Sequence, residues 1–164
     1  MKFCPNASSV LEFGAGAATI TTSLLEFKCL PENAQFLIAD LPTLTFHYAG
    51  RKFRECSNVE LCLLSPDQNF QLHTDRTFDN IFCCQVFEHL NEPLETVKRF
   101  YQNLKDGGIL IFDYIKGEGR GLDSLQGLRD RDAVLDFIAK NFKIEHGGVD
   151  PAGHVDLTVA RKLN

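Results

Sequence analysis

The chain has 164 residues, of which 44% are hydrophobic and 24% charged, and its formal net charge is −5. These values are typical of one soluble globular domain and exclude a disordered, collagen-like or coiled-coil chain. No apolar run reaches the roughly 18 residues of a membrane span, so we expect no membrane association. The acidic balance argues against a broad phosphate-binding surface, and a nucleic-acid acceptor is therefore not expected.

Six cysteines occupy positions 4, 29, 56, 62, 83 and 84, and no two of them form a C-x-x-C pair. Their number is low for a disulfide scaffold of this length. Cys62, Cys83 and Cys84 lie within apolar runs, where a reduced thiol serves as a small hydrophobe. The N-terminal residues lack the apolar core of a signal peptide. The sequence therefore predicts a cytoplasmic protein with free thiols.

Strand-like and helix-like segments alternate along the chain, as in a doubly wound α/β sheet. Short apolar runs predict strands at 9–13, 35–39, 59–64, 78–84 and 109–112. Helical spacing and end signals predict helices at 17–28, 43–55, 92–105 and 131–141. Two more strands, at 142–145 and 154–160, are joined by a short turn that predicts an antiparallel hairpin. The glycine-rich segment 116–121 is expected to be a loop.

The pattern also predicts one buried helix face and the end of one helix. Ile20, Leu24 and Phe27 fall on one apolar face of the first predicted helix. The segment Asp106-Gly107-Gly108 is expected to end the third helix before the fifth strand begins.

The most informative stretch is Glu12-Phe13-Gly14-Ala15-Gly16-Ala17-Ala18-Thr19, which leads from the first strand into the first helix. Glycines at this point let the backbone turn sharply and approach a ligand, and the helix that follows offers its amide dipole. Asp40 ends the next strand, where a carboxylate can accept hydrogen bonds from both hydroxyls of a ribose. The pattern therefore indicates a site for a cofactor that contains a ribose.

This stretch resembles the first motif of class I S-adenosylmethionine-dependent methyltransferases, which reads acid-x-Gly-x-Gly-x-Gly. Glu12, Gly14 and Gly16 match the motif, and Ala18 takes the third glycine's place. The resemblance implies that the glycine turn packs against the amino-acid and ribose parts of the cofactor. It also implies that Glu12 orients the turn or reaches the methionine amine, and that Asp40 holds the ribose.

Two later segments extend the resemblance. Glu88-His89-Leu90, after the fourth strand, is similar to a segment frequent in the family. Leu104 to Gly108 resembles the family's Leu-Lys-Pro-Gly-Gly turn, with Asp106 replacing proline. By the same analogy Asp67 lies near the adenine amino group, Leu41 packs on the adenine, and Gln85 lines the site through its backbone. The residues thus expected to bind the cofactor are Glu12, Gly14, Ala15, Gly16, Asp40, Leu41, Asp67 and Gln85.

The resemblance spans Val10 to Arg161 and implies the fold as well as the cofactor. The expected fold is a three-layer Rossmann-like doubly wound sheet of seven mostly parallel strands, the last of them antiparallel. A nucleotide-cofactor oxidoreductase is the alternative from another cofactor class. Its G-x-G-x-x-G fingerprint needs a small third residue, and Thr19 stands there.

His89 is the candidate catalytic residue. It follows the carboxyl end of the fourth strand, and its intrinsic pKa suits a base that deprotonates a hydroxyl or amine acceptor. The alternative is that His89 caps or packs on the next helix. Gln85, Glu88 and His89 would share one face if this stretch were helical, similar to the metal-binding Glu-x-x-Glu-His of some small-molecule O-methyltransferases. Glutamine in the first place removes a charged ligand, so no metal is expected.

Only Met1 to Ser8 precede the first strand, whereas family members usually carry helices there. We therefore expect one methyltransferase-like domain over residues 1–164 that lacks these helices and depends on a protein partner or a missing N-terminal segment. The predicted function is S-adenosylmethionine-dependent methyl transfer to a small-molecule acceptor. The alternative from another class is a catalytically silent methyltransferase-like subunit that binds the cofactor or a partner.

Overall fold

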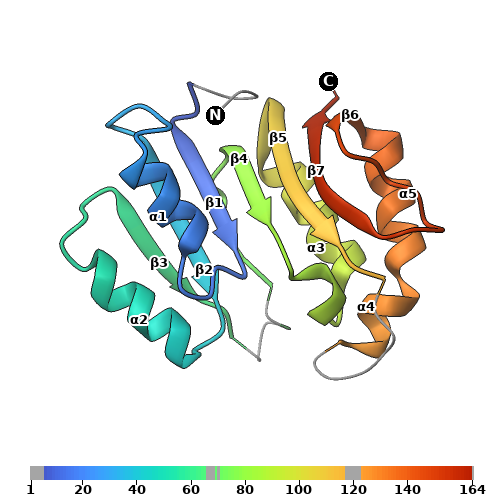
Figure 1. Ribbon diagram of the computed structural model, residues 1–164, viewed down its shortest axis with the longest axis horizontal. Helices are drawn as coiled ribbons and strands as arrows, with labels where there is room; N and C mark the ends of the chain where they lie inside the picture. Colours follow the sequence, from blue (N-terminus) through green and yellow to red (C-terminus); the bar gives the residue numbers. More distant parts are fainter. Residues whose placement is uncertain (1–5, 66–68, 70, 117–122, 164) are drawn as a thin grey trace.

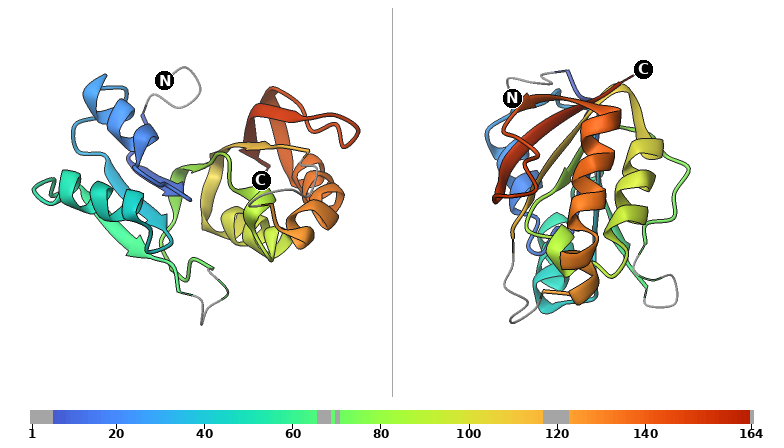
Figure 2. Two further views of the ribbon diagram at one scale, coloured as in Figure 1. Left: turned by 60° about the horizontal axis from the view of Figure 1, so that its bottom comes forward. Right: turned by 90° about the vertical axis from the view of Figure 1, so that its right-hand side faces the viewer.

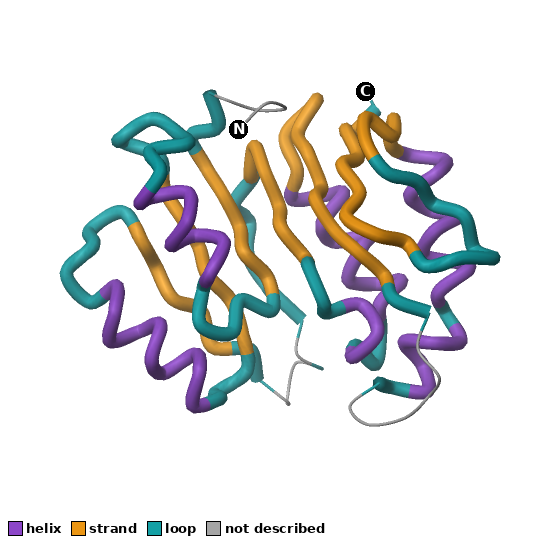
Figure 3. The backbone as a smooth tube through the Cα atoms, in the orientation of Figure 1, coloured by secondary structure: helices purple, strands orange, loops and turns teal. Residues whose placement is uncertain are grey.

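The computed structural model describes residues 6–65, 69, 71–116 and 123–163. Within this part of the chain, helices cover both faces of one seven-stranded sheet (Figures 1 and 3). The strands are β1 Ser9–Phe13, β2 Gln35–Asp40, β3 Val59–Leu63, β4 Phe78–Cys83, β5 Leu104–Tyr114, β6 Phe142–His146 and β7 Val155–Lys162. The helices are α1 Thr19–Glu26, α2 Leu44–Phe53, the 3₁₀ turn η2 Phe87–His89, α3 Pro93–Asn103, α4 Leu125–Arg129 and α5 Arg131–Asn141.

The strand order is β3-β2-β1-β4-β5-β7-β6, and β7 runs antiparallel to both of its neighbours while the other pairs are parallel. Helices α1 and α2 lie on one face of the sheet, and α3 and α5 lie on the other (Figures 1 and 2). The expected three-layer doubly wound fold is therefore confirmed, including its antiparallel strand. The order reverses between β1 and β4, and a cleft at the carboxyl ends of these strands is where such sheets bind ligands.

A buried aromatic group anchors the turn that follows β4. Phe87 stacks on Tyr114 with ring centroids 5.2 Å apart, and it meets Phe100 and Phe112 edge to face at 6.2 and 5.9 Å. Because Phe87 is fully buried, η2 is held against both α3 and β5. Such aromatic pairs stabilise by about 0.5–1.5 kcal/mol each beyond the area that they bury.

Helix α1 is shorter than the helix predicted at 17–28. Ala18 adopts a left-handed conformation with φ of 53°, so the chain enters the helix only at Thr19. The helix ends at Glu26, and Phe27 is 76% exposed instead of joining Leu24 on the buried face. Lys28, also at positive φ, turns the chain away immediately afterwards. The prediction that Phe27 lies on the apolar face of this helix was therefore wrong.

Strand β5 is longer than predicted, and a short helix was missed. The strand begins at Leu104, so the segment Asp106-Gly107-Gly108 lies within it and not before it. This is possible because the pairing with β4 shifts register beyond Leu104, and Gly107 takes a φ of 69°. The sequence signal for helix α4 is weak, because Gly127 in its middle is a poor helix former. None of the helices in the described ranges is long and apolar enough to cross a membrane.

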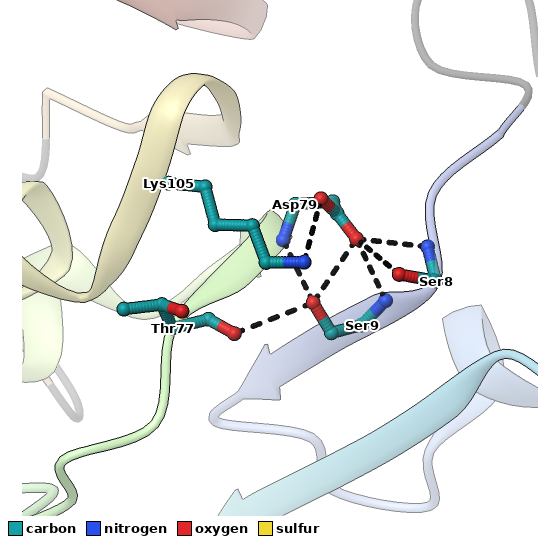
Figure 4. Close-up of polar contacts among 5 residues, drawn as sticks. All are labelled: Ser8, Ser9, Thr77, Asp79 and Lys105. Carbon is teal, nitrogen blue, oxygen red and sulfur yellow. Dashed lines mark hydrogen bonds and ion pairs between the residues drawn. The ribbon is translucent and has the colours of Figure 1, made fainter.

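Asp79 ties the first residues of three neighbouring strands together at the amino-terminal edge of the sheet (Figure 4). Its Oδ2 accepts hydrogen bonds from the backbone N–H and hydroxyl of both Ser8 and Ser9, at 2.8–3.0 Å. Its Oδ1 lies 2.9 Å from the Lys105 ammonium. Burial acts to raise the pKa of Asp79, but these donors outweigh burial and lower the pKa to about 2.

We expect Asp79→Asn to lower the free energy of unfolding by about 1–2 kcal/mol at neutral pH, because the side chain loses its charge. The folded pKa is depressed from 3.8, so this stabilisation is present above that value and is lost as the pH falls through about 2. Urea denaturation at neutral pH and near pH 2 measures the difference. Asp106→Asn is the control, since that carboxylate is 84% exposed. An equal loss of stability at both pH values would contradict the assignment.

Candidate active site

A cavity of about 290 Å³ opens at the carboxyl ends of β1 and β4, where the strand order reverses. Five of the residues selected from the sequence line it: Gly14, Asp40, Leu41, Gln85 and His89. The lining residues that sequence reasoning missed are Phe13, Leu64, Asn69, Gln71, Val86, Leu90 and Asn91.

Part of this missed set carried a usable signal. Leu64 and Val86 each follow the end of a parallel strand, which is where binding residues gather. Gln71 lies in no regular element and offered no such signal; it is buried and shares hydrogen bonds of 3.0 and 3.2 Å with Thr96 of α3. Of the remaining predicted residues, Ala15 is buried beside the cavity without lining it, and Asp67 lies outside the described residues.

The turn from β1 to α1 uses positive φ angles at Gly14 (68°) and Gly16 (54°). The N–H groups of Gly14 and Ala15 both donate to the carbonyl of Ala39, at 2.8 and 3.2 Å, so the turn closes against the end of β2. A Cβ at Gly14 would lie 2.3 Å from a methyl group of Val86, whereas a Cβ at Gly16 would meet nothing within 4 Å. The first glycine is therefore needed for packing, and the second leaves open space at the turn.

Glu12 caps helix α1 from the preceding strand. The helix begins after Ala18, which has no side chain that could cap it. The Glu12 carboxylate instead accepts the N–H groups of Ile20 at 3.3 Å and Thr21 at 2.8 Å. These amides are otherwise unpaired at a helix N-terminus, and a negative charge there is favourable. Burial raises the pKa of Glu12, which is only 3% exposed.

Asp40 joins the glycine turn to the end of β2. One carboxylate oxygen accepts the N–H of Gly16, and the other accepts the N–H of Leu41 at 2.6 Å. A carboxylate offers about four lone-pair positions, so further acceptor capacity remains for the hydroxyls of a ligand. Asp40 is partly buried and lines the cavity.

Gln85 is not helical, contrary to the arrangement that would place it on one face with Glu88 and His89. Its φ of 59° lies in the left-handed region, and only Phe87–His89 form a 3₁₀ turn. Asp113 holds this conformation by accepting the backbone N–H of Gln85 at 2.6 Å and its side-chain amide at 2.8 Å. Within the described ranges, no three His, Cys, Asp or Glu side chains lie together as a metal site.

His89 lies at the cavity wall between two carboxylates. Its Nε2 is 3.7 Å from Glu88 Oε1, and its Nδ1 is 3.7 Å from Asp123 Oδ1. The imidazole side chain is 40% exposed, whereas the Glu88 side chain is only 3% exposed. Burial raises the pKa of Glu88. The imidazole therefore lies between a cavity on one side and acidic groups on the other, a position that suits proton transfer.

Comparison with known proteins agrees with the fold and the motif. A family model described as "Methyltransferase domain" matches residues 11–110, which is more than half of the chain. A tRNA U34 carboxymethyltransferase from Desulfotalea psychrophila is 28% identical over 90 residues, covering 53% of this chain and 28% of that protein. The matched part of the chain thus covers less than a third of the length of this curated relative.

Two solved structures share the fold over nearly the whole chain. The N-methyltransferase NodS from Bradyrhizobium japonicum WM9, in complex with S-adenosyl-L-homocysteine, gives a TM-score of 0.72 at 16% identity, covering 97% of this chain and 80% of that one. A SAM-dependent methyltransferase from Aquifex aeolicus gives 0.70 at 20% identity, covering 99% and 86%.

The sheet, the glycine turn and the family match together define a class I S-adenosylmethionine-dependent methyltransferase domain. The chain belongs to the methyltransferase domain family. S-adenosylmethionine is the cofactor of this class, which favours it over the nucleotide cofactor of an oxidoreductase.

The two glycines of the turn should respond differently to substitution. We expect Gly14→Ala to lower the free energy of unfolding by about 2–3 kcal/mol, since the new methyl group meets the stiff Val86 side chain at a positive φ. Gly16→Ala should cost only about 1 kcal/mol, because strain acts there without a clash. Urea denaturation of the two variants measures this difference, and equal losses would contradict the packing role of Gly14.

Proposed function

We propose that the chain binds S-adenosylmethionine in the cavity at the β1–β4 switch point and methylates a small-molecule acceptor. The observation that carries the proposal is the convergence of Gly14, Asp40 and Leu41 on this cavity from two different strand ends. The bound cofactor supplies a methyl group activated by its sulfonium. The chain's own residues must then hold the donor, orient the acceptor and take up a proton.

The residues around the cavity fit this cofactor. Asp40 has acceptor capacity for the ribose hydroxyls, and the open side of Gly16 admits a ligand close to the backbone. Phe13, Leu41 and Leu64 give the cavity an apolar wall suited to a flat base such as adenine. Glu12 is satisfied by α1 amides, which supports the role of orienting the turn rather than of contacting the methionine amine.

His89 is proposed as the base that takes a proton from the substrate that is methylated. Its place on the cavity wall supports this role, as do the carboxylates of Glu88 and Asp123, which would stabilise the imidazolium. The two distances of 3.7 Å exceed hydrogen-bond length, and such contacts commonly shorten only when substrates are bound.

A small molecule is favoured as the acceptor because the rim of the site is acidic. Glu88 and Asp123 flank His89, Asp113 holds the neighbouring Gln85, and the negative charge of these groups repels the phosphates of a nucleic acid. A tRNA nucleoside is the second candidate, favoured by the match to a tRNA U34 carboxymethyltransferase. The cysteines in the described ranges are free thiols, which supports the proposal that the protein works in the cytoplasm.

The cofactor site is tested by titrating the purified chain with S-adenosylhomocysteine in a calorimeter. We expect saturable one-to-one binding, and we expect Asp40→Asn to weaken it about 10- to 100-fold, the effect of losing hydrogen bonds to a charged group. Asp106→Asn, which removes an exposed carboxylate on β5, is the control for the change in net charge. A folded wild-type chain that does not bind would contradict the proposal.

The acceptor is tested with radiolabelled S-adenosylmethionine, offered with a small-molecule extract or with unmodified tRNA. We expect label in the small-molecule fraction and a decrease of about 10²–10⁴-fold in kcat for His89→Asn. Label in tRNA alone would favour the second candidate. Cofactor binding with no label in either fraction would instead point to a catalytically silent subunit.

A further inference from the structure

Two carboxylates, those of Glu88 and Asp123, flank His89 beside the proposed cofactor cavity, and a third, that of Asp113, lies close enough to Glu88 to act on its pKa. Glu88 precedes His89 in η2, Asp123 lies just before α4, and Asp113 lies near the end of β5. Burial is the main cause that raises the pKa of Glu88; the charges of Asp113 and Asp123 raise it further, whereas His89 lowers it. In the part of the chain that the structure describes, no lysine or arginine forms an ion pair with any of the three. The site therefore holds several negative charges and one histidine.

Glu88 shows that this cluster is more than a solvated acidic surface. Its side chain is 3% exposed, and its Oε2 has no hydrogen-bond partner among the described residues. Its Oε1 faces the His89 imidazole at 3.7 Å. Burying a carboxylate oxygen without a partner is costly, and such groups are rare in folded proteins unless a ligand or ion completes them.

Asp123 is held in place by the packing of α4 on η2. The N–H of Ser124 donates to the carbonyl of Glu88 at 2.8 Å, and its hydroxyl donates to the carbonyl of Leu90. Gly127 packs so closely that a Cβ there would lie 2.6 Å from the Glu88 carbonyl oxygen. The buried Tyr114 hydroxyl donates to the carbonyl of Gly127 and fixes the other side of α4. The Asp123 carboxylate is thus built into the site by backbone contacts.

From this arrangement we infer that the methyl acceptor is a cationic amine, held by Glu88 and Asp123 beside His89. The inference rests on the proposed function, since it names the substrate class of the same site. A protonated amine would supply the positive charge and the N–H donors that the cluster lacks. A neutral alcohol would supply only a weak donor, and a phosphorylated acceptor would be repelled.

His89, Glu88 and Asp123 also account for the proton transfer that methylation of an amine requires. The ammonium group gives one proton to His89, which frees the lone pair on nitrogen. That lone pair forms a bond to the methyl carbon while the bond from this carbon to sulfur breaks, and the electron pair stays on sulfur. The proton held by His89 then passes to water, so atoms and charge balance. Glu88 and Asp123 stabilise the imidazolium during the transfer.

Matched amines and alcohols test the inference on the chain saturated with S-adenosylhomocysteine. Dissociation constants are measured by NMR for benzylamine against benzyl alcohol and for phenethylamine against phenethyl alcohol. We expect each amine to bind about tenfold more tightly than its alcohol, a modest factor because the rim is partly exposed. Equal binding of amines and alcohols, or no binding of either amine, would overturn the inference.

The carboxylates are tested by Glu88→Gln and Asp123→Asn. Each should reduce the preference for amines to near parity and leave the affinity for S-adenosylhomocysteine within about twofold, because neither residue lines the cofactor cavity. Asp136→Asn, which removes an exposed carboxylate on α5, should change neither affinity. A preference that survives both site variants would overturn the inference. A wild-type chain that does not bind S-adenosylhomocysteine would instead overturn the proposed function and this inference with it.

Stability separates a ligand-binding role of Glu88 from a structural one. The folded pKa of Glu88 is raised by burial, so its ionisation costs stability above that pKa and the cost disappears as the pH falls through it. Glu88→Gln should therefore be more stable than the wild type at neutral pH, with a difference that shrinks on acidification. A variant that loses stability at neutral pH would show that the carboxylate serves the fold.

Discussion

The turn that joins β1 to α1 depends on one buried carboxylate, that of Glu12. Three left-handed residues bring the chain out of the strand, and the helix then starts after Ala18, which offers no cap. Without the Glu12 carboxylate the amides of Ile20 and Thr21 would lose their acceptor, a cost of about 1–3 kcal/mol for the buried amide of Thr21. The capping group thus comes from the preceding strand. This arrangement holds the glycine turn at the edge of the sheet, where it forms one wall of the cavity.

The opposite wall is built from the turn after β4, and the two walls meet where Gly14 packs against Val86. This turn is held from two directions. Asp113 fixes the left-handed Gln85, and the stacking of Phe87 on Tyr114 anchors η2 in the core. The cavity lies where it does because the segments that follow β1 and β4 lead to helices on opposite faces of the sheet. Its shape follows from the few contacts that hold the two turns.

Features that repeat along the chain were predictable, whereas features set by contacts between distant segments were not. Strands β1, β2 and β4 are largely apolar runs, so their boundaries could be predicted closely, whereas β5 begins at Leu104 and not at the predicted residue 109. Gly14 and Asp40 could be selected from the sequence because strand ends and glycine spacing are local signals, and both line the cavity. The left-handed Gln85 depends on Asp113, which lies 28 residues further along. Likewise α4 depends on its close contact with η2, which overrides the low helix propensity of Gly127.

Glu12 and Glu88 are both buried glutamates near the carboxyl ends of neighbouring strands, yet the fold treats them differently. Both have a pKa raised by burial, but both oxygens of Glu12 accept amides of α1, whereas one oxygen of Glu88 has no partner in the described part of the chain. A carboxylate that is fully satisfied by backbone serves the scaffold. A buried carboxylate with an unpaired oxygen lowers the stability of the fold. Such destabilising groups are characteristic of functional sites. The contrast between the two glutamates distinguishes the carboxylate that supports the glycine turn from the one that we propose to hold the acceptor.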